Sequence, residues 1–171
     1  MKFSRADIPD IIIIEPEVFI DERGYFFESF KQDKLNHFLG FDVNFCQENE
    51  SKSTYGVLRG LHYQEPPFEQ AKLVRVIQGS VLDVAVDIRK NSTTFSKHFA
   101  IELNDKSKKQ LFIPRGFAHG FIVLSETAIF SYKVDNYYHP NFERNIIYSD
   151  QNLDIDWIID KSLIKTSLKD K

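Results

Sequence analysis

The feature that most constrains the fold of this chain is an alternation of side chains with a period of two residues. Between residues 82 and 88 every second side chain is a large aliphatic one, and the positions between them hold Asp83, Ala85 and Asp87. This period is typical of a β-strand, because successive side chains of a strand point to opposite faces of its sheet. The carboxylates on the second face indicate that this face lines water or a polar cavity.

Similar short segments recur along the chain and are separated by turn signals such as those at 22–24, 78–80 and 114–116. They lie at 17–20, 25–30, 43–49, 57–64, 72–78, 98–104, 110–113, 119–124 and 128–138. Many short strands at regular spacing, without the long crossovers that parallel strands require, are typical of antiparallel sandwiches and barrels. We therefore predict an all-β fold of the jelly-roll kind.

Helical signals are few. One helix is predicted over 33–39, where Leu35, Phe38 and Leu39 share one side and Gly40 ends the helix. The residues from Asp154 onward can hold short helical turns. A length of 171 residues suits one compact domain, and no repeat, low-complexity stretch or linker divides the chain. We therefore treat residues 1–171 as a single domain.

Charge and cysteine content exclude several classes of protein. The 22 Lys and Arg residues nearly balance 25 Asp and Glu residues, so a net charge of -3 supplies no bulk attraction to nucleic acid or to an anionic membrane. Cys46 is the only cysteine, which excludes an internal disulfide framework. The first ten residues are too polar for a signal peptide, and the longest apolar run, 11–14, is too short to span a bilayer. We expect a soluble cytoplasmic protein.

Several sequence motifs for catalysis and metal binding are missing. There is no glycine-rich phosphate loop, nucleophile elbow or pair of CxxC motifs. No two of the five histidines lie two to five residues apart, as many metal sites require. We therefore expect neither a metal nor a cofactor. Because distant histidines can still meet in space, a metal-dependent enzyme of the same fold stays open as an alternative.

The strand predicted over 57–64 carries the first group of chemical interest. His62 and Gln64 share a face with Leu58, and Gly60 permits a bulge that turns Arg59 toward them. Spacing alone leaves two readings open, since His62 can be a catalytic base or a histidine of the core or the sheet edge.

Two further strands carry candidate groups. Lys72 begins an otherwise apolar row in the strand over 72–78, and an inward lysine is costly unless it meets an anion. In the segment over 128–138, Tyr132 and Tyr138 share a face. A phenol near a cationic lysine can donate a proton. The alternatives are a surface lysine and tyrosines that only pack.

Seven segments together resemble the dTDP-4-dehydrorhamnose 3,5-epimerase family, in the right order and over nearly the whole chain. They are FIDERGYFFE (19–28), QENESKS (47–53), LRGLH (58–62), QAKLVR (70–75), DVAVDIR (83–89), IPRGFAHGF (113–121) and YKVDNYY (132–138). The resemblance implies a cupin-like double-stranded β-helix, or jelly roll, that works as a homodimer without metal. Its substrate is a dTDP-linked 4-keto-6-deoxy sugar.

The resemblance also implies catalytic roles. His62 is the base, Asp170 is the carboxylate that polarises it, Tyr132 is the acid on the opposite face, and Lys72 stabilises the enolate. Inversion beside a ketone requires such a set: a base, an opposing acid and a cation at the developing oxyanion.

The binding residues are implied in the same way. Arg23, Arg59 and Lys169 meet the diphosphate, and arginine forks suit phosphate oxygens. The thymidine and the sugar are held by Phe19, Glu28, Gln47, Asn49 and Tyr138. His119 and Asp83 lie near the reaction centre. The N-terminal strands of the family pair across the dimer, so Arg23 and Glu28 are expected to serve the neighbouring subunit's site.

Three other functions stay open. A related enzyme can invert only C3 or only C5, or can act on another nucleotide keto-sugar. A metal-dependent cupin such as a dioxygenase would contain bound iron, zinc or manganese. A carbohydrate-binding jelly roll would bind a sugar without turnover.

Overall fold

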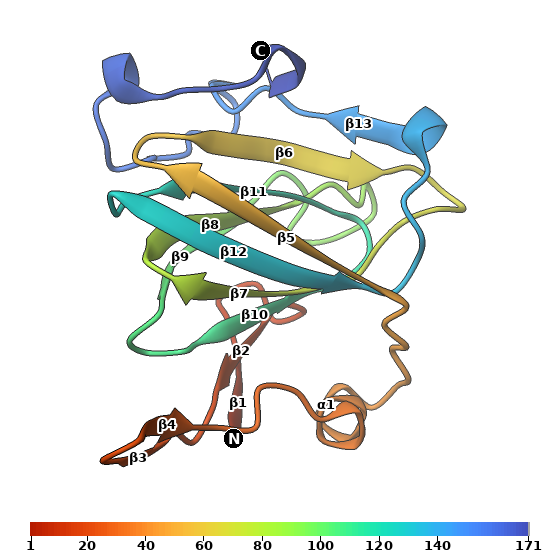
Figure 1. Cartoon of the computed structure of the whole chain (residues 1–171). Helices are drawn as coiled ribbons and strands as arrows, with labels where there is room; N and C mark the ends of the chain where they lie inside the picture. The colour runs from red at the N-terminus through yellow and green to blue at the C-terminus, as the bar shows by residue number, and fades with distance from the viewer. Residues whose placement is uncertain (171) are drawn as a thin grey trace.

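Two antiparallel sheets packed face to face form the body of the molecule, and a hairpin and a helix extend from one end (Figure 1). The computed structural model of the chain describes residues 1–170, so Lys171 lies outside the described part of the predicted domain. The six-stranded sheet has the order β1 (Lys2–Arg5), β2 (Ile12–Glu15), β10 (Gln110–Ile113), β7 (Lys72–Gln78), β12 (Thr127–Val134) and β5 (Gln47–Thr54). The five-stranded sheet has the order β13 (Glu143–Asn145), β6 (Leu58–Gln64), β11 (Phe117–Val123), β8 (Ser80–Asp87) and β9 (His98–Asn104).

The remaining elements are short. The hairpin consists of β3 (Phe19–Asp21) and β4 (Gly24–Phe26), and the helix is α1 (Gln32–Leu39). Three single 3-10 turns follow the last long strand: η1 (Pro140–Phe142), η2 (Lys161–Leu163) and η3 (Leu168–Asp170). The two packed antiparallel sheets and the few short helices confirm the predicted all-β jelly roll. No helix within residues 1–170 is long and apolar enough to cross a membrane.

The main hydrophobic core lies between the two sheets. Val74 and Phe130 from the six-stranded sheet meet Ala85 and Phe121 from the five-stranded one, and the rings of Phe121 and Phe130 stack with centroids 4.1 Å apart. Stacked aromatic rings add to the stabilisation that comes from burying their area. Phe121 and Phe130 also border the cavity between the two sheets.

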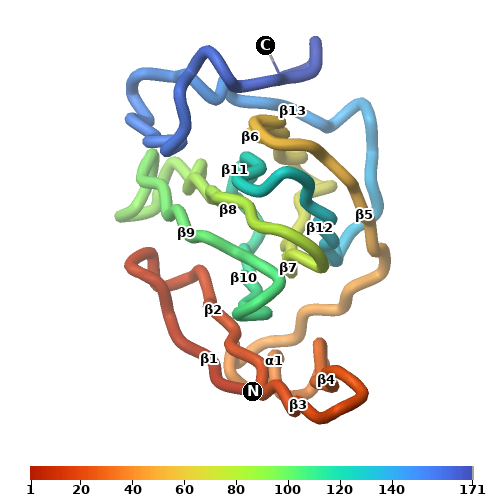
Figure 2. Tube along the Cα trace, turned by 60° about the vertical axis from the view of Figure 1, so that its left-hand side comes forward, coloured from red at the N-terminus to blue at the C-terminus, as the bar shows by residue number. Residues whose placement is uncertain are grey.

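Two smaller clusters cover the outer faces of the sandwich. The C-terminal segment lays Trp157 against Leu58, Val84 and Ile122 of the five-stranded sheet. Helix α1 covers the other sheet near β2 and β10, where Leu35 is buried. Figure 2 shows the C-terminal segment and the N-terminal strands at opposite ends of the molecule. Both faces of β8 are therefore buried, and neither is exposed to solvent.

The two carboxylates of β8 are fully buried and are bonded to protein groups. Asp83 lies beside His119, and Asp87 accepts hydrogen bonds from Arg89, Ser92 and Thr94. The sequence predicted that these carboxylates line water or a polar cavity. Their hydrogen-bond partners are instead mainly protein side chains, since a buried carboxylate is stable only when it is paired.

Several predicted element boundaries were wrong, and three strands were not predicted. Most of the segment 11–14 belongs to strand β2 (Ile12–Glu15), but its run of four isoleucines shows no alternation because it is covered on both sides. The predicted strand 128–138 ends at Val134, where the Asp135 carboxylate turns to accept from the backbone of Ala71 and the side chain of Arg115. The strand predicted over 43–49 lies instead at 47–54 as β5. Strands β1 and β13 were also missed, since both are short and polar.

The helix prediction was correct within one residue. Gly40 adopts a left-handed conformation with a φ of 81°, and its N–H donates to the carbonyl of Asn36. Glycine adopts this conformation without steric cost, which is why it commonly ends helices.

Candidate active site

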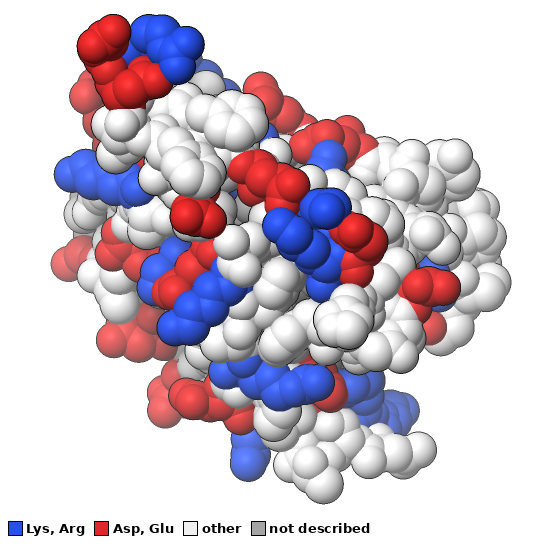
Figure 3. All heavy atoms as spheres, turned by 90° about the horizontal axis from the view of Figure 1, so that it is seen from below, with Lys and Arg blue, Asp and Glu red and all other residues white. Residues whose placement is uncertain are grey.

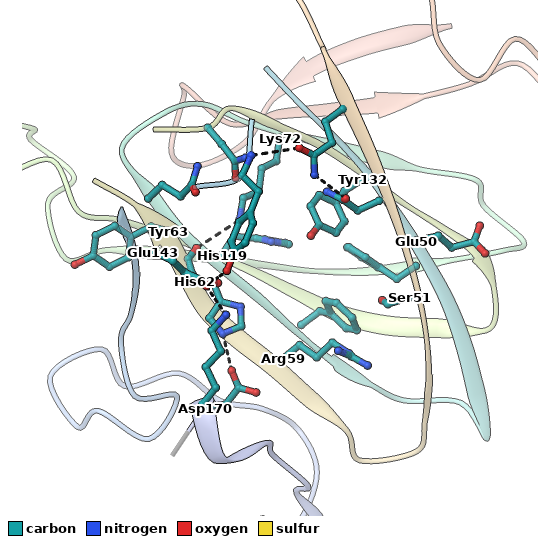
Figure 4. A pocket seen from close by; sticks show the side chains of 18 of the residues that line it. Glu50, Ser51, Arg59, His62, Tyr63, Lys72, His119, Tyr132, Glu143 and Asp170 are labelled. Carbon is teal, nitrogen blue, oxygen red and sulfur yellow. Dashed lines mark hydrogen bonds and ion pairs between the residues drawn. The ribbon is translucent and has the colours of Figure 1, made fainter. Parts of the chain in front are cut away.

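A cavity of about 480 Å³ opens between the two sheets at the end nearest the C-terminal segment (Figure 4). Its walls come from β5, β6, β7, β11, β12 and β13 together with the turn η3. The structure brings ten of the predicted site residues to this one space: Gln47, Asn49, Arg59, His62, Lys72, His119, Tyr132, Tyr138, Lys169 and Asp170. Residues more than 120 positions apart in the sequence therefore meet at a single site.

His62 lies on β6 and is paired with a carboxylate from the end of the chain. Its Nε2 lies 2.5 Å from Oδ1 of Asp170, whose side chain is only 4% exposed. Burial lowers the pKa of His62 below its ordinary value, and Asp170 opposes that shift without cancelling it. The imidazole is therefore neutral at pH 7 and able to accept a proton, with a carboxylate ready to stabilise its charged form.

A bulge in β6 aims both His62 and Arg59 into the cavity. The pairing of β6 with β11 gains one residue between these two positions, and Gly60 lies at that point with a φ of 139°. A Cβ on Gly60 would lie 2.4 Å from the Cα of Gly120, so the close approach of the strands requires glycine.

The bulge confirms the prediction that Arg59 turns toward His62, but the prediction that Leu58 shares a face with His62 was wrong. Leu58 packs beneath the C-terminal segment on the outer face, so it does not share a face with His62. The extra residue reverses the alternation between these two positions. The guanidinium of Arg59 donates from Nε to Oγ of Ser53 at 3.0 Å.

Lys72 begins β7 and points inward, as predicted. The residue is 8% exposed, and its Nζ lies 3.4 Å from the carbonyl oxygen of His62. Burial lowers the pKa of Lys72 to about 8, while the carboxylates of Asp83 and Glu143 work in the opposite direction. The ammonium is thus held in the cavity at neutral pH, where it can meet an oxyanion.

Tyr132 lies on β12, in the sheet opposite His62. Figure 4 shows its ring across the cavity from the imidazole, with Lys72 on the same side of the space. Burial raises the pKa of the Tyr132 phenol, and the carboxylate of Glu143 raises it further. The phenol therefore keeps its proton at neutral pH and can donate it.

A second His–carboxylate pair lies deeper. His119 on β11 faces Asp83 on β8, with Nε2 at 2.9 and 3.1 Å from the two carboxylate oxygens. His119 borders the cavity, whereas Asp83 lies behind it and is fully buried. This pair is fixed within the sheet and orients the His119 ring toward the cavity.

Glu143 on β13 is a cavity residue that the sequence analysis missed. Its Oε2 accepts a 2.6 Å hydrogen bond from the hydroxyl of Tyr138 and forms an ion pair with Lys169. Burial alone would raise the pKa of Glu143, but Lys169 and Tyr138 outweigh it and hold the pKa below its ordinary value. A three-residue strand within a polar stretch shows no periodicity, so no local signal pointed to this carboxylate.

Three predicted binding residues do not reach this cavity. Phe19 and Arg23 belong to the exposed hairpin at the opposite end of the molecule (Figure 1). Arg23 pairs with Asp21 at 2.5 Å, and Glu28 pairs with Lys34 at 2.8 Å. Within one chain these side chains are therefore not part of the site.

The donor set of the site is poor in metal ligands. Among the side chains of residues 1–170, no three His, Cys, Asp or Glu groups gather in an arrangement that could hold a metal ion. The cavity instead combines a carboxylate-paired imidazole, a buried ammonium and a protonated phenol. These groups can remove a proton from carbon, stabilise the resulting charge and return a proton from the other side.

Comparison with known proteins identifies the family of this chain. A sequence model of the dTDP-4-dehydrorhamnose 3,5-epimerase family matches residues 5–171. The dTDP-4-dehydrorhamnose 3,5-epimerase of Shigella flexneri is 52% identical over 164 residues, covering 96% of this chain and 91% of the relative.

Solved structures agree as well. The dTDP-4-dehydrorhamnose 3,5-epimerase of Elizabethkingia anophelis superposes with a TM-score of 0.95 at 50% identity, covering 99% of this chain and 93% of the other. The dTDP-6-deoxy-D-glucose-3,5-epimerase of Legionella pneumophila, solved with dTDP-4-keto-L-rhamnose, gives a TM-score of 0.95 at 47% identity, covering 99% and 89%. This chain therefore belongs to the dTDP-4-dehydrorhamnose 3,5-epimerase family.

Proposed function

We propose that this chain converts dTDP-4-keto-6-deoxy-D-glucose into dTDP-4-keto-L-rhamnose by inverting C3 and C5 of the sugar. The observation that carries the proposal is the position of His62 and Tyr132 on opposite walls of one cavity, with Lys72 beside them. The family to which the chain belongs supports the choice of substrate.

The C4 ketone of the substrate makes the hydrogens on C3 and C5 removable, because the electron pair left on carbon delocalises onto the ketone oxygen. His62 takes the proton from carbon, and Asp170 stabilises the imidazolium that forms. The enolate oxygen receives a hydrogen bond from the ammonium of Lys72, which carries its charge below a pH of about 8. Tyr132 then donates its proton to the opposite face of the same carbon, which inverts the centre.

The nucleotide is held by groups apart from this chemistry. Arg59 and Lys169 are proposed to bind the diphosphate, while Gln47, Asn49 and Tyr138 hold the thymidine and sugar. Gln47 supports this arrangement by donating to Asn49 at 2.9 Å and accepting from the backbone of Tyr138 at 3.2 Å. The segment that carries Tyr138, between β12 and η1, is thus tied to β5.

We further propose a homodimer in which the hairpin of one subunit completes the site of its partner. The hairpin exposes a cluster of large apolar side chains: Phe19, Ile20, Tyr25 and Phe26. Such clusters are typical of interaction surfaces. Exchange of hairpins would bring Phe19, Arg23 and Glu28 to the neighbouring cavity, which a single chain does not achieve.

Other expectations remain part of this proposal. We propose one epimerase domain over residues 1–171, a cytoplasmic location, and a role in supplying dTDP-L-rhamnose to surface polysaccharides such as lipopolysaccharide. On the face seen in Figure 3, acidic and basic side chains are interspersed, which favours neither nucleic acid nor an anionic membrane as a partner.

Incubation with dTDP-4-keto-6-deoxy-D-glucose in deuterated water tests the function. We expect deuterium at both C3 and C5 of the product, detected by mass spectrometry and NMR. Label at one carbon alone would identify a single-centre epimerase. Absence of label, together with stoichiometric iron, zinc or manganese in the purified protein, would favour a metal-dependent cupin.

A further inference from the structure

Asp170 reaches His62 from a turn with little packing of its own. The turn η3 follows the segment that pairs with the start of β6, where Leu58 donates its N–H to the carbonyl of Lys165 at 2.9 Å. Within the turn, Leu168 is 87% exposed whereas Asp170 is 3% exposed. Hydrogen bonds, rather than apolar burial, must therefore decide where the Asp170 carboxylate lies.

Ser167 supplies two of these hydrogen bonds. Its Oγ donates to Oδ2 of Asp170 at 2.7 Å and accepts from the backbone N–H of Lys169 at 3.2 Å. Oδ1 of the same carboxylate faces Nε2 of His62 at 2.5 Å. The carboxylate is thus held at both oxygens, one by the serine and one by the imidazole. Figure 4 shows the contact between Asp170 and His62.

A carboxylate held at both oxygens cannot rotate freely about its bond to Cβ. The ring nitrogen of His62 that faces Asp170 then carries the proton, and the other ring nitrogen keeps the lone pair that a base needs. Without the serine hydroxyl, Oδ2 would lose a partner in a buried position and Oδ1 would lose its fixed direction. Asn145 of β13 anchors the same turn from outside, since its side-chain amide donates to the carbonyl of Lys169 at 2.9 Å.

We propose that Ser167 is a positioning residue for epimerisation, which orients Asp170 so that His62 is held as a base in the correct tautomer. This inference rests on the proposed function for its kinetic consequence, but its structural part concerns only the three side chains. Ser167 acts through Asp170 and takes no part in proton transfer itself.

The first test is the kinetics of Ser167→Ala with the dTDP-keto-sugar. We expect kcat to fall about tenfold, the lower end of the effect of one hydrogen bond to a charged group and less than the loss of Asp170 itself, with KM within about twofold. Ser167→Thr keeps the hydroxyl and should recover most of the activity. Leu168→Ala, in the same turn but exposed, is the matched control and should leave kcat unchanged. A raised KM at constant kcat would overturn the proposal, since it would indicate a direct contact with substrate.

The second test is a double-mutant cycle. If Ser167 acts through Asp170, then Ser167→Ala should cost almost nothing in an Asp170→Ala background. An equal loss in both backgrounds would overturn the proposal. Thermal unfolding identifies any variant that has lost its fold, and Ser167→Cys, close in volume but a weak donor, replaces Ser167→Ala in that event.

The third test needs no substrate. The imidazole of His62 is titrated by NMR in the free protein, with His119 as an internal control. Lys72 and Lys169 also lower the pKa of His62 through their positive charges, and neither lysine is substituted in Ser167→Ala. We expect Ser167→Ala to lower the pKa of His62, because the attraction of Asp170 weakens, and to leave His119 unaffected. An unchanged His62 titration would overturn the positioning role, whereas inactivity of the wild-type protein would refute only the proposed function.

Discussion

Two His–carboxylate pairs lie next to each other in this molecule and differ in how they are built. His62 and His119 are paired across β6 and β11, and each has its Nε2 bonded to an aspartate, Asp170 for the first and Asp83 for the second. Asp83 belongs to β8, the strand that pairs with β11, so the sheet itself fixes that pair. Asp170 comes from a short turn 108 residues away in sequence.

The exposure of the two imidazoles follows this difference. The side chain of His119 is 7% exposed and that of His62 is 26% exposed. A base must reach the carbon of its substrate, so it cannot be sealed on all sides, whereas an orienting group can. The comparison teaches that strand pairing alone places one His–carboxylate pair, whereas the pair that we propose to be reactive is completed by the turn η3 on the open side of the sheet.

The largest expected effect separates the two histidines. His62→Ala should lower the rate of solvent-deuterium incorporation about 10³-fold, because it removes the base. Binding of dTDP should change little, since the diphosphate contacts that we propose, Arg59 and Lys169, are separate groups. His119→Ala should cost only about tenfold. Equal losses for the two variants would refute the assignment of His62 as the base, and isothermal titration with dTDP provides the binding control.

Tyr132→Phe tests the proposed proton donor, which lies on the cavity wall opposite both histidines. Removing the hydroxyl should lower the rate of inversion about 10²-fold, while His62 can still take and return a proton on its own face. Deuterium should therefore enter the unconverted substrate faster than product appears, which NMR of the reaction mixture measures. Loss of exchange and inversion in equal proportion would contradict separate roles for the two groups.

The two aspartates should differ in what they stabilise. Asp170→Ala should lower kcat about 10- to 100-fold and leave the free energy of unfolding nearly unchanged, because water can reach His62. Asp83→Ala leaves buried His119 without its partner and should lower the free energy of unfolding by about 1–3 kcal/mol. Urea unfolding and steady-state kinetics measure both quantities. A strong loss of stability in Asp170→Ala would show that the turn is structural.

A change of pH should have the smallest effect. We expect kcat/KM to fall about tenfold per pH unit on the acidic and on the basic side of its maximum. Activity requires neutral His62, whose pKa is lowered by burial, so the acid limb of kcat/KM should lie below 6.5. It also requires protonated Lys72, so activity should fall as the pH rises through about 8. Lys72→Met should lower the overall rate and remove that basic limb. A flat profile between pH 7 and 10 would contradict the role of the ammonium.

The sequence was sufficient to predict most of the strands, the helix and many of the residues that line the cavity. The sequence predicted β7 and β10 with their observed bounds, because the turn signals at 78–80 and 114–116 end the two segments. Alternation failed for β2, where four consecutive isoleucines leave no polar position, and for β5, whose inward face is polar because it lines the cavity. A pattern of hydrophobic residues predicts a strand only where one of its faces is buried among apolar groups. It does not predict a strand whose inward face is polar because it lines a site.

Resemblance to the family predicted the residue types but not every contact. It pointed to Asp170 as the partner of His62, and the two lie 2.5 Å apart. It did not point to Glu143, which joins Tyr138 to Lys169, because that role depends on where a three-residue strand lies.

The linear order of side chains thus determined the fold class, the family and the chemical groups available, since periodicity and motifs are local properties of a chain. Only the tertiary structure decided which groups meet. The bulge at Gly60 turns Arg59 and His62 to the same side, and η3 carries Asp170 beside His62. Those outcomes depend on strand pairing between distant segments and on burial, which together set distances and pKa values that no local pattern contains.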